Sequence, residues 1–182
     1  MAYFKKIVGK GIYLSPMDTD DVETYTKWLN DYDVSANLGL YRQMISLPNE
    51  REELERLAAD GQNYAIVLQG EDKLIGNVSL VDIDHVNRKA TVGLFIGEAM
   101  YRDKGHGAEA LRLILGYGFD TLNLHNVMLL VHSDNGRAIA CYKKAGFREF
   151  GRRRDAKFKD GRYIDDVYME ILDAEFRALH TQ

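Results

Sequence analysis

Residues 90–132 read ATVGLFIGEAMYRDKGHGAEALRLILGYGFDTLNLHNVMLLVH, and this stretch decides the fold. Ala90–Ile96 predicts a strand, and apolar residues at helical spacing from Gly105 to about Leu122 predict a long helix. The continuous apolar run within Asn126–His132 predicts a second strand, buried on both faces. A strand, a long helix and a buried strand in this order indicate a parallel crossover. A ligand is expected at the carboxyl end of the strand that leads into such a helix.

The sequence on either side predicts antiparallel strands and further helices. Upstream we expect a strand at Gly11–Met17, helices at Asp20–Leu29 and from Pro48 to Gly61, and strands at Tyr64–Gln69 and Lys73–Ile83. Downstream we expect a helix at Gly136–Ala145 and strands at Phe147–Lys157 and Tyr163–Leu172, joined through Asp160-Gly161. The predicted fold class is mixed α/β (α+β). Its central, mostly antiparallel twisted sheet has about seven strands with a parallel pair in the middle, and there are about four helices.

Length and composition indicate one globular domain. The 182 residues fit a single domain over residues 1–182, and a net charge of -4 predicts no nucleic-acid partner. No apolar run approaches the roughly 20 residues that span a bilayer, so no membrane partner is expected. The first residues, MAYFKKIVGKG, lack the apolar core of a signal peptide, and we therefore expect a cytoplasmic protein. Cys141 is the only cysteine and cannot form an intrachain disulfide.

The loop Arg102–Ala108 has the features of a phosphate-binding site. Gly105 and Gly107 allow a tight turn and a close approach of the backbone to a bulky anion. The helix behind the loop offers unpaired N–H groups and the positive end of its dipole, and Arg102 and Lys104 add positive charge. From this loop alone, a glycine-rich turn that enters a core helix is an equally good interpretation.

A second segment, residues 135–147, reads NGRAIACYKKAGF. The two segments together resemble the GNAT superfamily of acyltransferases, which carries R/Q-x-x-G-x-G/A after its fourth strand and N-x-x-A-x-x-x-Y-x-K-x-G-F after its fifth. The chain has RDKGHG at the first position, and the expected helix and strand separate the two motifs. The resemblance covers residues 9–172. The closing GRYIDDVYMEI resembles the branch of ribosomal-protein N-terminal and polyamine acetyltransferases.

The resemblance implies acetyl-CoA as co-substrate and no metal. The backbone of Leu94, Phe95 and Ile96 would line the pantetheine arm. The N–H groups from Lys104 onward would hold the pyrophosphate. The loop that would contact the cofactor comprises Arg102, Asp103, Lys104, Gly105, His106, Gly107 and Ala108. Asn135 would contact the cofactor arm, cap the following helix, or do both.

Tyr142 is the catalytic acid that the resemblance implies. It would contact the thioester sulfur and protonate the departing thiolate, because a phenol with a pKa near 10 stays protonated at neutral pH. A core-filling role is the alternative interpretation of this side chain.

The general base has no clear candidate. Many relatives carry a glutamate near the start of the fourth strand, where this chain has Thr91. Glu98 and Asp165 are candidates, although a solvated or hairpin-stabilising carboxylate is the alternative interpretation of each. The acceptor is expected to be a small-molecule or peptide amine, namely a protein N-terminus, a polyamine, an amino acid or an aminosugar. Trp28, Tyr32 and Tyr41 are expected to line its pocket, and a homodimer would fit the family.

Two other functions fit parts of the pattern. A non-catalytic module that senses CoA or a metabolite would keep the same loop and would explain Thr91. A dinucleotide-binding oxidoreductase would use Gly105–Ala110 as G-x-G-x-x-A, but it needs an acidic residue about 20 positions further on, and Val127–Val131 contains none. The five histidines show no metal-ligand spacing.

Overall fold

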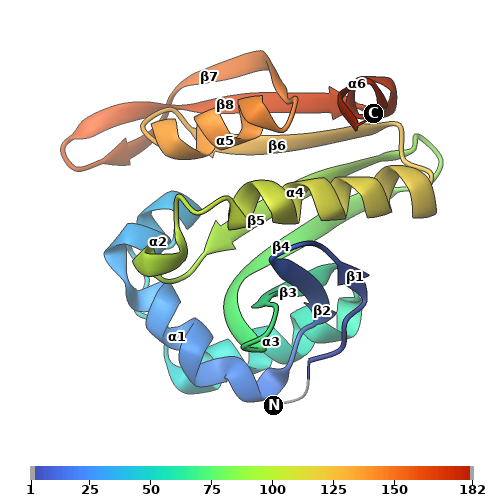
Figure 1. Cartoon of the computed structure of the whole chain (residues 1–182). Helices are drawn as coiled ribbons and strands as arrows, with labels where there is room; N and C mark the ends of the chain where they lie inside the picture. The colour runs from blue at the N-terminus through green and yellow to red at the C-terminus, as the bar shows by residue number, and fades with distance from the viewer. Residues whose placement is uncertain (1–2, 181–182) are drawn as a thin grey trace. The chain divides into compact units, whose positions relative to one another are not determined.

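A computed structural model describes residues 3–180 of the chain (Figure 1). In this part of the chain the strands follow the order β1-β2-β3-β4-β5-β6-β8-β7 in one mixed sheet of eight. The strands are β1 (Ile7–Val8), β2 (Ile12–Pro16), β3 (Asn63–Leu68), β4 (Lys73–Asp84), β5 (Lys89–Ile96), β6 (Asn126–His132), β7 (Arg148–Lys159) and β8 (Arg162–Leu172). The α-helices are α1 (Val22–Asn30), α2 (Tyr32–Leu38), α3 (Leu47–Asp60), α4 (His106–Gly116), α5 (Gly136–Lys144) and α6 (Asp173–His180).

The predicted seven strands and four helices were therefore too few for the described residues, which hold eight strands and six α-helices. The missed elements are short. β1 has two residues, and α2 begins just after α1 ends, where the Asp31 carboxylate accepts a hydrogen bond from the Asp33 N–H at 2.9 Å. α6 follows β8 directly, and the Glu175 carboxylate accepts from the Leu172 N–H. Local side-chain hydrogen bonds start these helices, and hydrophobic periodicity does not reveal such bonds.

The described chain forms two compact units. One contains the residues up to Val81 together with Gly93–Ile114, and the other contains Asp82–Val92 together with the residues from Leu115 onward. In the first unit, helices α1 to α3 pack against the sheet face that carries Tyr13, Ala65 and Val67, around a core of buried side chains. The predicted antiparallel pairing of β3 with β4 is confirmed.

In the second unit, the start of β5 pairs with β6 in parallel, which confirms the predicted crossover pair. β8 runs antiparallel to both β6 and β7, and α5 lies in front of these strands in Figure 1. The β7–β8 hairpin turns through Asp160 and Gly161, at φ +51° and +76°, as the Asp-Gly pair predicts.

The prediction that β6 is buried on both faces was wrong. Val127, Leu129 and Val131 are at most 5% exposed, whereas Leu130 is 42% exposed. Alternate side chains of β6 therefore point to a buried core and to a partly exposed face with Asn126, Met128 and Leu130; on this face Asn126 donates to Glu170 at 2.8 Å. No helix among the described residues is both long enough and apolar enough to cross a membrane.

Candidate active site

The loop before α4 builds a helix N-terminus that is open to an anion. Asp103 and Gly105 adopt left-handed conformations, at φ +59° and +88°. The Glu109 N–H donates to the Gly105 carbonyl at 2.9 Å, so the helical hydrogen bonds begin only at that residue. The N–H groups of the three residues before Glu109 therefore precede the first helical bond, and this is the arrangement that binds phosphate at helix termini.

Arg102 supports this loop through its own backbone contacts. Its Nε donates to the Ile96 carbonyl at 3.2 Å and its Nη2 donates to the Gly97 carbonyl at 2.7 Å. The guanidinium therefore fixes the loop to the end of β5. Lys104 lies with its Nζ 5.9 Å from the centre of the Tyr101 ring. A contact of either side chain with a phosphate stays a prediction.

Glu109 is a functional residue of this region that the sequence did not predict. Its carboxylate accepts hydrogen bonds from the N–H groups of Lys10 and Gly11 and so attaches the first turn of α4 to the β1–β2 turn. A Cβ on Gly9 would lie 2.3 Å from Glu109 Oε1, so Gly9 leaves the room for this contact. The partners are 98 and 99 residues apart, and no local pattern pairs them.

The end of β5 supports the stretch predicted to line the pantetheine arm. Leu94, Phe95 and Ile96 are half-buried. The Phe95 ring meets the Trp28 ring edge-on, with centroids 6.1 Å apart. Gly97 lies over the same indole, and a Cβ there would be 2.1 Å from it.

The three aromatic residues predicted to line the acceptor pocket fall into two places within the first unit. Trp28 is a core residue, 2% exposed, and its Nε1 has no hydrogen-bond acceptor among the described residues. Tyr32 is 48% exposed, and its ring lies edge-on to that of half-buried Tyr41 with centroids 6.0 Å apart. The structure therefore brings Tyr32, the first residue of α2, together with Tyr41 beyond the end of that helix, and places Trp28 in the core.

The candidate base Glu98 is engaged in ion pairs. Its carboxylate lies 3.9 Å from Lys27 Nζ and 4.0 Å from Lys73 Nζ. The geometry therefore gives Glu98 a role in ion pairs with two lysines.

Tyr142 is held in the second unit as a buried acid. It is 7% exposed, and burial raises the pKa of Tyr142 to about 12, so its hydroxyl keeps its proton at neutral pH. The Phe147 ring packs edge-on against it with centroids 5.9 Å apart. Gly146, just before Phe147, has φ +100°, and a Cβ there would lie 2.5 Å from Leu179 Cδ1 and 2.9 Å from Ile171 Cδ1, so this position after α5 requires glycine.

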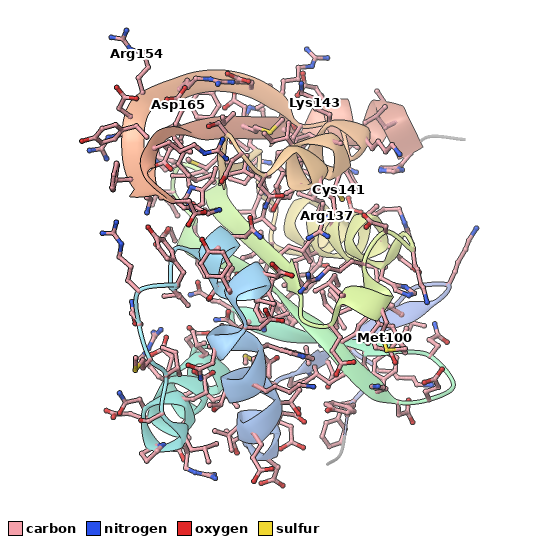
Figure 2. The ribbon with its side chains drawn as sticks, turned by 90° about the vertical axis from the view of Figure 1, so that its left-hand side faces the viewer. Met100, Arg137, Cys141, Lys143, Arg154 and Asp165 are labelled. Atoms are coloured by element: carbon pink, nitrogen blue, oxygen red, sulfur yellow. The ribbon has the colours of Figure 1, made fainter. Side chains whose placement is uncertain are left out.

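Asn135 caps α5, as predicted: its Oδ1 accepts from the Ala138 N–H at 3.1 Å. Its contact with the cofactor arm stays a prediction. Arg137 and Cys141 project from one face of α5, and Lys143 lies on another (Figure 2).

The second candidate base, Asp165, stabilises an irregular part of β7. Its Oδ1 accepts from the Asp155 N–H at 3.0 Å, and its Oδ2 lies 3.4 Å from Arg152 Nη1. Asp155 has φ +51°, and the β7–β8 register shifts at this point. The Asp165 carboxylate therefore supplies the hydrogen-bond acceptor for an N–H group that the bulge in β7 leaves without a strand partner. The exposed side chain of Arg154, next to this bulge, points away from the hairpin in Figure 2.

The loop, the capped α5 and the buried tyrosine correspond to a known family. A family model described as an acetyltransferase (GNAT) domain matches residues 12–148, more than half of the chain. The chain belongs to the GNAT family. GNAT acetyltransferases use acetyl-CoA, and among residues 3–180 no group of three or more His, Cys, Asp or Glu side chains could hold a metal ion.

Several GNAT relatives act on amines according to their names. Spermidine N(1)-acetyltransferase of Escherichia coli K12 is 33% identical over 121 residues, which cover 66% of this chain and 64% of that protein. The "Putative ribosomal N-acetyltransferase YdaF" of Bacillus subtilis is 31% identical, over 84% of this chain and 80% of its own. The chain therefore spans less than two thirds of the length of the first of these relatives.

Solved structures agree with the family. A spermidine N-acetyltransferase from Vibrio cholerae in complex with CoA and spermine aligns with a TM-score of 0.80 at 25% identity, over 92% of this chain and 99% of that one. A GNAT acetyltransferase from Bacillus anthracis aligns with a TM-score of 0.82 at 21% identity, over 93% of this chain and 99% of that one, and shows the shared fold.

Proposed function

We propose that this chain transfers the acetyl group of acetyl-CoA to a primary amine of a small polycation, a polyamine in the first instance, with Tyr142 as general acid. The observation that carries the proposal is the place of Tyr142, a buried phenol on α5 that is 7% exposed and keeps its proton at neutral pH. It lies on α5, which has the residues that the family's second motif requires.

The backbone N–H groups in the first turn of α4 are suited to hydrogen-bond the phosphates of the cofactor. The N–H groups of His106, Gly107 and Ala108 precede the first helical hydrogen bond, and the helix dipole favours negative charge there. Acetyl-CoA supplies the activated acetyl group as a thioester. The chain's own part is to hold this group, to accept protons from the amine and to give one to the sulfur that leaves.

Tyr142 supplies that last proton. As the bond between the amine nitrogen and the acetyl carbon forms, the bond from this carbon to sulfur breaks, and the Tyr142 O–H proton passes to the thiolate. A proton lost by the amine nitrogen then restores the phenol. The raised pKa keeps Tyr142 protonated before each turnover and makes the phenolate that follows a strong proton acceptor.

A polyamine fits the charge of the first unit. Residues 18–33 contain six acids, Asp18, Asp20, Asp21, Glu23, Asp31 and Asp33, against the single cation Lys27. Tyr32 lies between Asp31 and Asp33 and meets Tyr41, so aromatic faces and carboxylates occur together. A chain of ammonium groups is attracted to both. The names of the Escherichia coli and Vibrio cholerae relatives point to the same substrate class.

Thermal unfolding with acetyl-CoA, CoA or NAD, each at about 100 times a plausible Kd, tests the cofactor. Binding should stabilise the fold by about 2.7 kcal/mol and raise Tm by roughly 5–10 °C with both CoA forms and not with NAD. Thiol release is then measured with spermidine, spermine, a short peptide with a free N-terminus and glucosamine.

Each outcome of the acceptor screen is informative. Turnover with the polyamines supports the proposal, and turnover only with the peptide or the aminosugar overturns the polyamine assignment. A thermal shift without turnover on any amine overturns catalysis and favours the sensor. That function is the alternative because Thr91 stands where many relatives have an acid.

A further inference from the structure

The carboxyl end of β6 holds a buried histidine–aspartate pair. His132 ends β6, and Asp166 is its partner on β8 in the antiparallel register. Their side chains are 7% and 6% exposed, with His132 Nδ1 3.0 Å from Asp166 Oδ1. Burying a carboxylate costs free energy that its hydrogen bonds offset only in part, so stability alone is a poor reason for this pair.

Asp166 fixes the tautomer of the imidazole. An ionised carboxylate only accepts hydrogen bonds, so we assign the proton of the 3.0 Å contact to His132 Nδ1. The lone pair of a neutral ring is then on Nε2. Among residues 3–180, the hydrogen bond to Asp166 is the one that the ring makes. A histidine oriented in this way by a carboxylate is arranged to accept a proton.

The turn that follows His132 contains a carboxylate oxygen, Asp134 Oδ1, to which no group among the described residues donates a hydrogen bond. Asp134 Oδ2 accepts from Lys159 Nζ at 2.8 Å, but Asp134 Oδ1 is buried and has no hydrogen-bond partner among the described residues. A buried carboxylate oxygen without a donor is costly, and an amine or ammonium group would supply one. The next residue, Asn135, caps the helix that carries Tyr142. The dyad and the open oxygen therefore lie on the same connection as the proposed acid.

The reaction also needs a base that removes a proton from the amine, and the two bases predicted from the sequence are engaged elsewhere. Glu98 is paired with two lysines, and Asp165 holds the β7 bulge. A lysine-like amine with a pKa near 10.4 is neutral only about once in 2,500 at pH 7, which costs about 4.6 kcal/mol.

A second histidine–aspartate pair lies beside the opposite end of β6. His125 Nδ1 is also 3.0 Å from Asp173 Oδ1, but these side chains are 53% and 25% exposed. The chemistry of the two pairs is the same, whereas burial and the neighbouring motif differ. His125 is therefore a matched control for His132.

We propose that His132, oriented by Asp166, is the general base that deprotonates the acceptor amine. The inference rests on the proposed acetyl transfer. The ammonium group gives one proton to His132 Nε2 and becomes a neutral amine. The amine nitrogen then bonds to the acetyl carbon and loses a second proton, which replaces the one that Tyr142 gives to the departing sulfur. His132 returns its proton to water, so one proton is released in each turnover.

The test compares His132→Gln, His125→Gln and the unaltered chain in thiol release with spermidine from pH 6 to 10. Glutamine can still donate to Asp166 but cannot take up a proton. His132→Gln should lower kcat/KM for the amine about 10²–10³-fold near pH 7.5, with a smaller deficit at pH 10, where more amine is neutral. Acetyl-CoA affinity should be unchanged, and His125→Gln should match the unaltered chain.

Both variants keep the charged residues of the second unit that lie near His132 in the strand register and in the following turn. They are Asp166, its β7 partner Arg153, the neighbouring Asp165 on β8, and Asp134 with Lys159. A change in the acid limb of the pH profile therefore reports on His132 itself. An equal loss at all pH values, or no loss, would overturn the proposal. Absence of amine turnover by the unaltered chain would instead overturn the proposed function.

A measurement on the unaltered chain covers the case in which His132→Gln does not fold. ¹⁵N NMR of the histidine side chains, assigned through correlations with the backbone signals of each residue, should show His132 protonated on Nδ1 and not on Nε2. It should titrate at the same pH as the acid limb of kcat/KM. The opposite tautomer, or a titration away from that limb, would contradict the assignment.

Discussion

The loop before α4 and the β6–α5 connection, defined as His132 to Tyr142, are proposed to serve the site in opposite ways. In the loop, we propose that backbone N–H groups bind the cofactor, while Arg102 and Glu109 use their side chains to hold backbone. In the β6–α5 connection, we propose that the side chains of Tyr142 and His132 carry the chemistry; the Phe147 ring packs against Tyr142, and the Asp166 carboxylate lies beside His132. The loop should therefore be sensitive to any change that blocks or moves its backbone. The connection should be sensitive to the loss of single polar atoms.

The largest expected effect comes from blocking the backbone of the loop. Gly107→Phe places a ring where a phosphate would approach the first turn of α4 and should weaken acetyl-CoA binding about 10³-fold or more, measured by calorimetry. His106→Ala, which removes a neighbouring side chain and leaves the backbone, should change the Kd by less than about threefold. Equal effects of the two changes would mean that side chains bind the cofactor in this loop.

Removing one oxygen in the β6–α5 connection should have the next largest effect. Tyr142→Phe keeps the ring that packs on Phe147 and should lower kcat about 10²-fold or more, while the Kd for acetyl-CoA stays within about threefold. Cys141→Ser, one residue earlier on α5, is the control and should keep kcat. A Tyr142→Phe variant with full turnover would remove this residue from the mechanism.

Much of the loop before α4 and of helix α5 could be predicted from the sequence, because both depend on residues that are close together along the chain. The two glycines and the helix start predicted the loop, and Asn135 before the helix predicted the cap. Burial of Tyr142 was only the alternative interpretation of that side chain. The contacts of Glu109 with the β1–β2 turn and of His132 with Asp166 could not be predicted. Each joins residues 34 or more positions apart: the tertiary fold brings Glu109 to the β1–β2 turn, and the strand register brings His132 to Asp166. The same reason applies to Asp165, whose role depends on a bulge in the neighbouring strand.

The packing at the end of α5, which carries Tyr142, can be tested by measuring the stability of the fold. Gly146→Ala puts a methyl group against Leu179 and Ile171 at a backbone φ of +100° and should lower the free energy of unfolding by about 1–3 kcal/mol. Gly151→Ala is the control, because nothing lies within 4 Å of its Cβ and the residue is not among those with positive φ. Thermal unfolding should show a fall of several degrees for the first variant and little change for the second. Equal Tm values would mean that α5 ends without this constraint.

The smallest expected effect comes from Glu109, whose side chain contacts the backbone of the β1–β2 turn. The test asks whether Glu109 affects the reaction only by holding the first turn of α4 in place. Glu109→Gln keeps the shape of the side chain and removes the charge that accepts from Lys10 and Gly11. A charge-assisted hydrogen bond is worth about 1.5–3 kcal/mol, and the amide oxygen of glutamine retains part of it. We therefore expect the Kd for acetyl-CoA to rise only about three- to tenfold, with kcat at saturating cofactor unchanged. A fall in kcat at saturation would show that Glu109 reaches the reacting groups, and the division between a backbone-built loop and a side-chain-built connection would then fail.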